Sequence, residues 1–100
     1  MRMMMKVKFD TEAGSKALAD GSMSQFMQEV MGRLKPEAAY FGPEDGVRTA
    51  FIIFDMQDPS ELPAISEPFF GKLQAKILMF PVMNQEDLQK GLQQLGSSAQ

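Results

Sequence analysis

The sequence predicts an α+β fold in which a four-stranded antiparallel sheet carries two main helices on one face. Two segments, 47–56 (VRTAFIIFDM) and 75–83 (AKILMFPVM), are short, apolar and rich in β-branched and aromatic residues, as buried strands are. Two other stretches place apolar residues at helical spacing. The segments follow one another in the order β-α-β-β-α-β with an additional C-terminal helix, which is the ferredoxin-like pattern.

The first third of the chain supplies one strand and the first main helix. Residues Met3–Phe9 alternate between two faces, one apolar and one mostly charged, and predict a strand. The stretch 10–21 is turn-rich and weakly helical, with Asp10 or Thr11 as its cap. A stronger helix follows over 22–35 and ends before a proline. Its apolar stripe is Met23, Phe26, Met27, Val30, Met31 and Leu34.

A β-hairpin is expected in the middle of the chain. Glu37–Phe41 predicts its first strand, and 42–46 predicts the turn, with Asp45-Gly46 as the hairpin signal. The second strand is then 47–56, antiparallel to the first.

The second main helix has a well-marked start and a proline within it. Asp58 can cap the helix, and Pro59 suits its first position. Pro68 lacks an N–H and clashes with the preceding turn, so a break or kink is expected near Ser66 or Glu67.

The chain closes with an edge strand and a last helix. Pro81 cannot donate to a sheet ladder, which places strand 75–83 at an edge or beside a bulge. Asn84 and Asp87 predict the capping of a final helix that stops at Gly96, before a frayed tail at 97–100. Its apolar stripe is Leu88, Leu92 and Leu95. One domain, 1–100, is expected from the length.

The second apolar face of the sheet requires a cover that this chain does not supply. In the strand 47–56, Phe51 and Ile53 point one way, and Ala50, Ile52 and Phe54 point the other. Helices on one side leave the other side bare, and a bare apolar sheet face is larger than the patches that soluble monomers expose. A second copy, paired sheet to sheet about a two-fold axis, is the expected cover.

In the order and patterning of its elements, the chain resembles the dimeric α/β-barrel superfamily over about residues 3–95. The runs KPEAAYF, RTAFIIFDM and DPSELPAISEPFF also resemble a small bacterial branch for which no activity is established. The resemblance implies a dimer in which two sheets form a barrel. Haem-using members rely on a histidine ligand, and this chain has no histidine.

Composition excludes several classes of function. A net charge of −3 without basic runs argues against nucleic-acid binding. No apolar stretch is long enough to span a bilayer, so a cytoplasmic location is expected. With no cysteine and no histidine, the chain lacks the usual thiolate nucleophile, general base and zinc ligands. No cofactor and no metal site are therefore expected.

The residues expected to bind a ligand are Met4, Lys6, Arg48, Ile52 and Phe54. They would form an apolar pocket between the sheets with a cation at its mouth, suited to a small hydrophobic or weakly anionic molecule. The sequence leaves open whether Arg48, Ile52 and Phe54 or the alternate set with Phe51 faces inward. The lysine and arginine could equally lie in water or in salt bridges.

Tyr40 and Asp55 are the candidate proton-transfer groups. Tyr40 is the only tyrosine, and Asp55 ends an apolar strand, where its pKa could be raised. Three functions follow: a homodimeric small-molecule binder, a cofactor-independent isomerase or monooxygenase, and a structural accessory subunit. The binder is the leading expectation because catalytic groups are so few.

Overall fold

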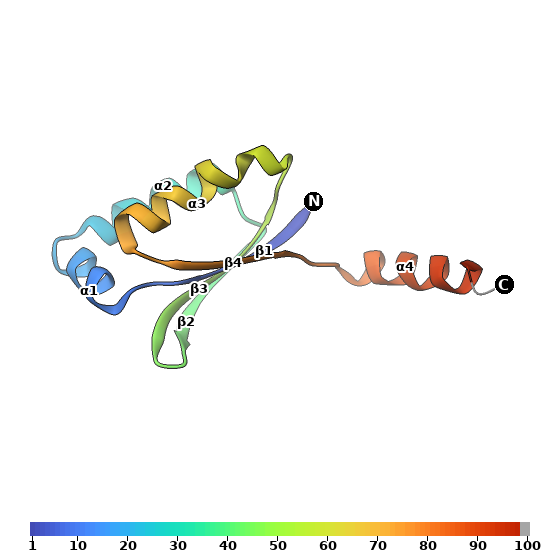
Figure 1. Ribbon diagram of the computed structural model, residues 1–100, viewed down its shortest axis with the longest axis horizontal. Coiled ribbons are helices and arrows are strands. Elements are labelled where there is room, and N and C mark those ends of the chain that lie inside the picture. The colour runs from blue at the N-terminus through green and yellow to red at the C-terminus, as the bar shows by residue number, and fades with distance from the viewer. Residues whose placement is uncertain (99–100) are drawn as a thin grey trace.

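The computed structural model describes residues 1–98 as one four-stranded sheet with helices (Figure 1). Its elements are β1 (Arg2–Lys8), α1 (Thr11–Ala19), α2 (Ser22–Leu34), β2 (Ala38–Glu44), β3 (Val47–Asp55), the 3-10 turn η1 (Pro59–Glu61), α3 (Leu62–Leu73), β4 (Lys76–Pro81) and α4 (Gln85–Ser98). The expected element order is confirmed, with the weakly helical stretch after β1 forming the separate helix α1.

The sheet has the strand order β2-β3-β1-β4, and every neighbouring pair is antiparallel. This is the ferredoxin-like topology, so the predicted fold class is confirmed. The helices α1, α2 and α3 lie on one side of the sheet (Figure 1). β4 is an edge strand, as Pro81 predicted, because a proline is tolerated where no neighbour needs its N–H.

The core lies between the sheet and these three helices. Met5 and Ile52 oppose each other on β1 and β3 and are fully buried. Phe54 points to the same side and packs into the same cluster as Phe69 of α3. Phe69 meets Phe26 of α2 edge to face, with ring centroids 5.1 Å apart, which ties the two helices together over the sheet.

The β2–β3 hairpin turns at the expected two residues, but its first strand is longer than expected. Asp45 and Gly46 both have positive φ, 55° and 75°, as a type I′ turn requires. Glu44 pairs directly with Val47, so β2 continues through Pro43 instead of ending at Phe41. Pro43 fits because β2 is also an edge strand.

Of the break or kink expected near Ser66 or Glu67, the break is wrong, because α3 runs unbroken through Pro68. The residue at position 68 would normally bond the carbonyl of Ala64, four residues earlier. Arg33 of α2 donates to that carbonyl instead, with 2.9 Å between Nη1 and the oxygen. A donor from a neighbouring helix therefore replaces the one that proline lacks.

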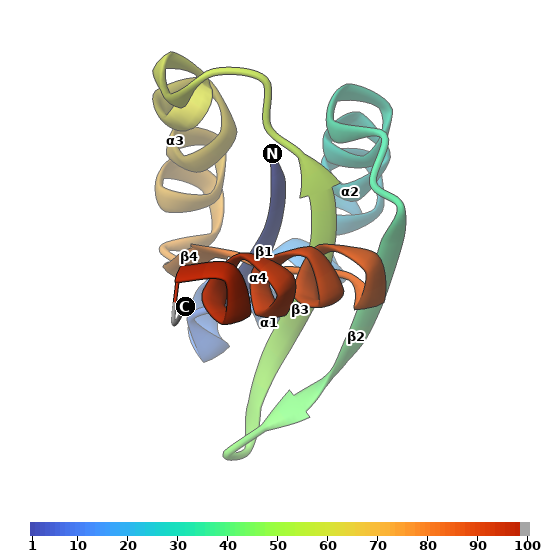
Figure 2. The ribbon, with the colours of Figure 1, turned by 90° about the vertical axis from the view of Figure 1, so that its right-hand side faces the viewer.

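The last helix, α4, stands apart from the rest of the molecule (Figure 1) and lies in front of the sheet when the molecule is viewed from that end (Figure 2). Its expected cap is confirmed: the Asp87 amide donates to Asn84 Oδ1 at 2.8 Å, and the Asn84 amide donates to Asp87 Oδ2 at 3.1 Å. The helix passes the expected stop at Gly96 and includes Ser98, the last described residue. Of the expected frayed tail, residues 99–100 lie outside the described residues. No helix within residues 1–98 is long and apolar enough to cross a membrane.

Candidate functional site

The side of the sheet opposite α1, α2 and α3 is the predicted site, and we call it the open face. Strand alternation places every second residue of β1 there, together with the residues opposite them. From the pairing register, the open face consists of Arg2, Met4, Lys6, Lys8, Ala38, Tyr40, Gly42, Glu44, Val47, Thr49, Phe51, Ile53, Asp55, Lys76, Leu78 and Phe80.

Two rows of the open face cross all four strands and are almost entirely apolar. The first row is Phe80, Met4, Ile53 and Ala38, and the second is Leu78, Lys6, Phe51 and Tyr40. Leu78 and Phe80 are 58% and 46% exposed, and Tyr40 is 67% exposed. These rows form a contiguous apolar surface that no helix of the chain covers in residues 1–98.

Lys6 is the one charged residue within these rows, and it has partners. Its Nζ lies 2.6 Å from Glu44 Oε1 and 5.8 Å from the centroid of the Phe51 ring. Lys8 lies 3.2 Å from the same Glu44 oxygen and 3.4 Å from Asp45. The hydrogen bond from Lys6, followed by that from Lys8, lowers the pKa of Glu44 from its ordinary value of 4.5. Charge on this part of the open face is therefore balanced.

The five residues expected to line one pocket do not share a surface. Met4 and Lys6 lie on the open face, whereas Ile52 and Phe54 lie in the core under the helices, 0% and 1% exposed. Arg48 also lies on the helix side, where its Nη1 donates to the Thr11 carbonyl at 3.3 Å. The alternate set with Phe51 and Ile53 is the one that faces outward. Strand alternation alone does not reveal which set of residues faces the helices. The prediction that these five residues line one pocket is therefore wrong.

The two candidate proton-transfer residues are not brought together. Tyr40 lies opposite Phe51, four residues before Asp55 along β3, which is roughly 13 Å of strand. The amino group of Met1 donates to Asp55 Oδ1 at 2.6 Å, and Gln57 donates to Asp55 Oδ2. The hydrogen bond from the amino group lowers the pKa of Asp55, which corrects the expected raised value.

An apolar cleft on the helix side of the sheet is another candidate site, and the sequence did not predict it. It has a volume of about 490 Å³ and lies between α1, α2 and the β2–β3 hairpin. Its lining is Phe9, Leu18, Met23, Met27, Phe41, Gly42, Pro43, Arg48 and Thr49. No sequence pattern marks this cleft, because its lining residues come from several segments that are separated along the chain.

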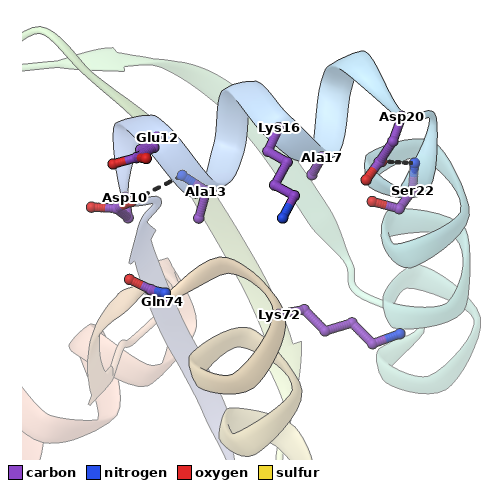
Figure 3. A pocket seen from close by; sticks show the side chains of 9 residues that line it. All are labelled: Asp10, Glu12, Ala13, Lys16, Ala17, Asp20, Ser22, Lys72 and Gln74. Carbon is purple, nitrogen blue, oxygen red and sulfur yellow. Dashed lines mark hydrogen bonds between the residues drawn. The ribbon is translucent and has the colours of Figure 1, made fainter.

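A polar hollow of about 410 Å³ lies where α1 meets the ends of α2 and α3 (Figure 3). Two of its three carboxylates already accept hydrogen bonds from backbone amides. Asp10 accepts from the Ala13 amide and Asp20 from the Ser22 amide, each at 2.9 Å. The hydrogen bonds from Ser22 lower the pKa of Asp20. Lys16 and Lys72 complete the rim of a hollow that is built from helix caps.

No group of three His, Cys, Asp or Glu side chains in residues 1–98 is arranged to hold a metal ion. The family described as a domain of unknown function (DUF3303) matches residues 1–96. No curated protein and no solved structure matches the chain with significance. A function for this chain is therefore inferred from the geometry of its surface.

Proposed function

The chain belongs to the DUF3303 family, a domain of unknown function, and from its geometry we propose a homodimeric small-molecule binder. Two copies pair through their open faces as a dimeric α/β barrel and hold a small hydrophobic or weakly anionic molecule between them. The observation that carries the proposal is the pair of apolar rows crossing the whole sheet with no cover. An exposed apolar surface of that extent is typical of an interface or a binding site.

The chemistry of the open face sets the ligand class. Two sheets that face each other are about 10 Å apart, so side chains from both fill the space and small gaps remain for a ligand. Met4, Phe51 and Ile53 offer apolar contacts. Lys6 is already paired with Glu44, so a weakly acidic ligand would share that cation instead of meeting a bare charge. Hydrophobic contact is therefore the main source of affinity.

The apolar cleft beside α1 and α2 is a second candidate location for the same ligand class. Arg48 lies on its lining with an otherwise apolar surround, the combination that an amphipathic acid requires. No observation favours the isomerase or monooxygenase expectation, since Tyr40 and Asp55 lie apart and Asp55 is held by the Met1 amino group.

Native mass spectrometry of freshly purified protein tests the proposal. The expected result is a mass of twice the 11.1 kDa chain plus a retained organic molecule. The hydrophobic anion 8-anilinonaphthalene-1-sulfonate then serves as a probe for three variants. Lys6→Gln should weaken its binding at least threefold, while Arg48→Gln and the control Lys16→Gln should leave it unchanged. A loss with Arg48→Gln alone moves the site to the cleft, and a ligand-free monomer overturns the proposal.

A further inference from the structure

The leucine stripe of α4 has no partner among the described residues of its own chain. Leu88, Leu92 and Leu95 recur at helical spacing and are 44%, 56% and 67% exposed. A helix of 14 residues is marginal in water without tertiary contacts, because most helix stability in proteins comes from packing an apolar face. We therefore expect this leucine stripe to pack on an apolar surface that lies outside its own chain.

Arg2 fixes the direction in which α4 leaves the sheet. Its carbonyl accepts from the Val82 amide at 3.1 Å, which holds the connection just after β4. Its guanidinium lies 3.1 Å from Asp87, in the first turn of α4, and 2.6 Å from Glu37. Both ends of the connection are thus held by one residue of the open face. The start of α4 is consequently on the same side as the bare apolar rows.

From there the helix extends away from its own domain, as Figure 1 shows. The radius of gyration is 16.4 Å, whereas a compact domain of 100 residues has about 13 Å. The long axis is 60 Å against 29 and 18 Å for the other two. Because of this extension, α4 does not pack against the hydrophobic core of its own chain.

We infer that α4 is an exchanged arm, whose leucine stripe packs on a second copy of this chain along its edge strand β4, beside the paired sheets. This inference rests on the dimer of the proposed function. The receiving surface includes Leu78 and Phe80 of the edge strand β4, which remain exposed in the single chain. A two-fold axis makes the exchange mutual, since each protomer gives one helix and receives one.

The area of the open face supports a second copy as the occupant. Four strands about 4.8 Å apart and about 20 Å long give a flat area of about 400 Å². A standard interface buries about 800 Å² on each partner. The exchanged helix is about 21 Å long. It adds buried area on both chains, because each chain receives the helix of its partner and gives its own. The accessible area of the open face is larger than this projection because side chains stand out from the sheet, and arm exchange adds further contact area on both chains.

Light scattering over a dilution series separates this inference from the proposed function. The variant Leu88→Gln/Leu92→Gln/Leu95→Gln keeps helix propensity and should raise the dimer Kd at least tenfold. The control Lys90→Gln/Gln93→Ala alters the opposite side of α4 and should leave the Kd unchanged. Phe51→Lys tests the open face itself and should also yield monomers. Circular dichroism confirms that each variant is folded.

If the triple-glutamine variant dimerises as tightly as the wild type while Phe51→Lys is monomeric, the exchanged arm is refuted and the dimer stands. A monomeric wild type refutes both. Because the chain has no cysteine, a disulfide test is also clean. Isotopically heavy Leu92→Cys protein is mixed with light Leu78→Cys protein and oxidised. A heavy–light disulfide is expected, and its absence refutes the exchange, as does an intrachain bond in the Leu78→Cys/Leu92→Cys chain.

Discussion

Pro68 has no N–H to donate to the Ala64 carbonyl within α3. The hydrogen bond that Arg33 donates to this carbonyl should therefore stabilise the helix. Removing the donor with Arg33→Met keeps most of the aliphatic stem and leaves that carbonyl without a protein donor. A hydrogen bond from a charged donor contributes about 1.5–3 kcal/mol. The contact is exposed and immobilises a long side chain, so the expected loss is about 1 kcal/mol.

A double-mutant cycle isolates this contribution. Pro68→Ala restores an amide that can reach Ala64 from within the helix, so Arg33→Met should cost almost nothing in that background. The coupling between the two substitutions is therefore expected to be about 1 kcal/mol. Urea unfolding followed by circular dichroism measures all four proteins, and Lys90→Met controls for the loss of one positive charge. Equal costs of Arg33→Met in the two backgrounds would refute this explanation of the unbroken helix.

Three further predictions concern the core, the hairpin and the open face. Phe69→Ala should lower the free energy of unfolding by about 3–5 kcal/mol in urea titrations, because the ring is fully buried against Phe26. Gly46→Ala should cost about 1 kcal/mol or more in the same assay; its φ of 75° is strained for alanine, although nothing lies within 4 Å of the added carbon. Glu44→Gln should flatten the acid dependence of stability. The hydrogen bond from Lys6 holds the folded pKa of Glu44 below 4.5, so its contribution is present above that pH and is lost as the pH falls. The urea midpoints of wild type and variant should converge between pH 7 and pH 3, and a constant gap would contradict the prediction.

Local signals predicted the elements well. The helical stripe of α2 and the Asn84–Asp87 cap depend on residues a few positions apart, and both appear in the structure. Asp58 and Pro59 begin the 3-10 turn η1, whereas the α-helix α3 begins only at Leu62. The Asp45-Gly46 turn also fixes the β2–β3 register, so the position of Tyr40 opposite Phe51 could have been read from the sequence.

The site was harder to predict because it depends on contacts between distant residues. Strand 47–55 is apolar on both faces, so only its packing against the helices reveals that Ile52 is inside and Phe51 outside. The lowered pKa of Asp55 arises from an amino group 54 residues away. The unbroken α3 depends on an arginine from another helix. None of these contacts leaves a periodic trace in the sequence.

The place of β1 in the sheet also determines the order in which the fold can be completed. Within this sheet β1 is synthesised before the other strands, and both of its neighbours, β3 and β4, come later. Met3 lies opposite Phe54 on one side and Pro81 on the other. The β2–β3 hairpin closes locally, whereas β1 must wait unpaired on one edge until residue 81 is available. The sheet should therefore be completed during synthesis only after β4 has emerged, and α4 follows three residues after that strand.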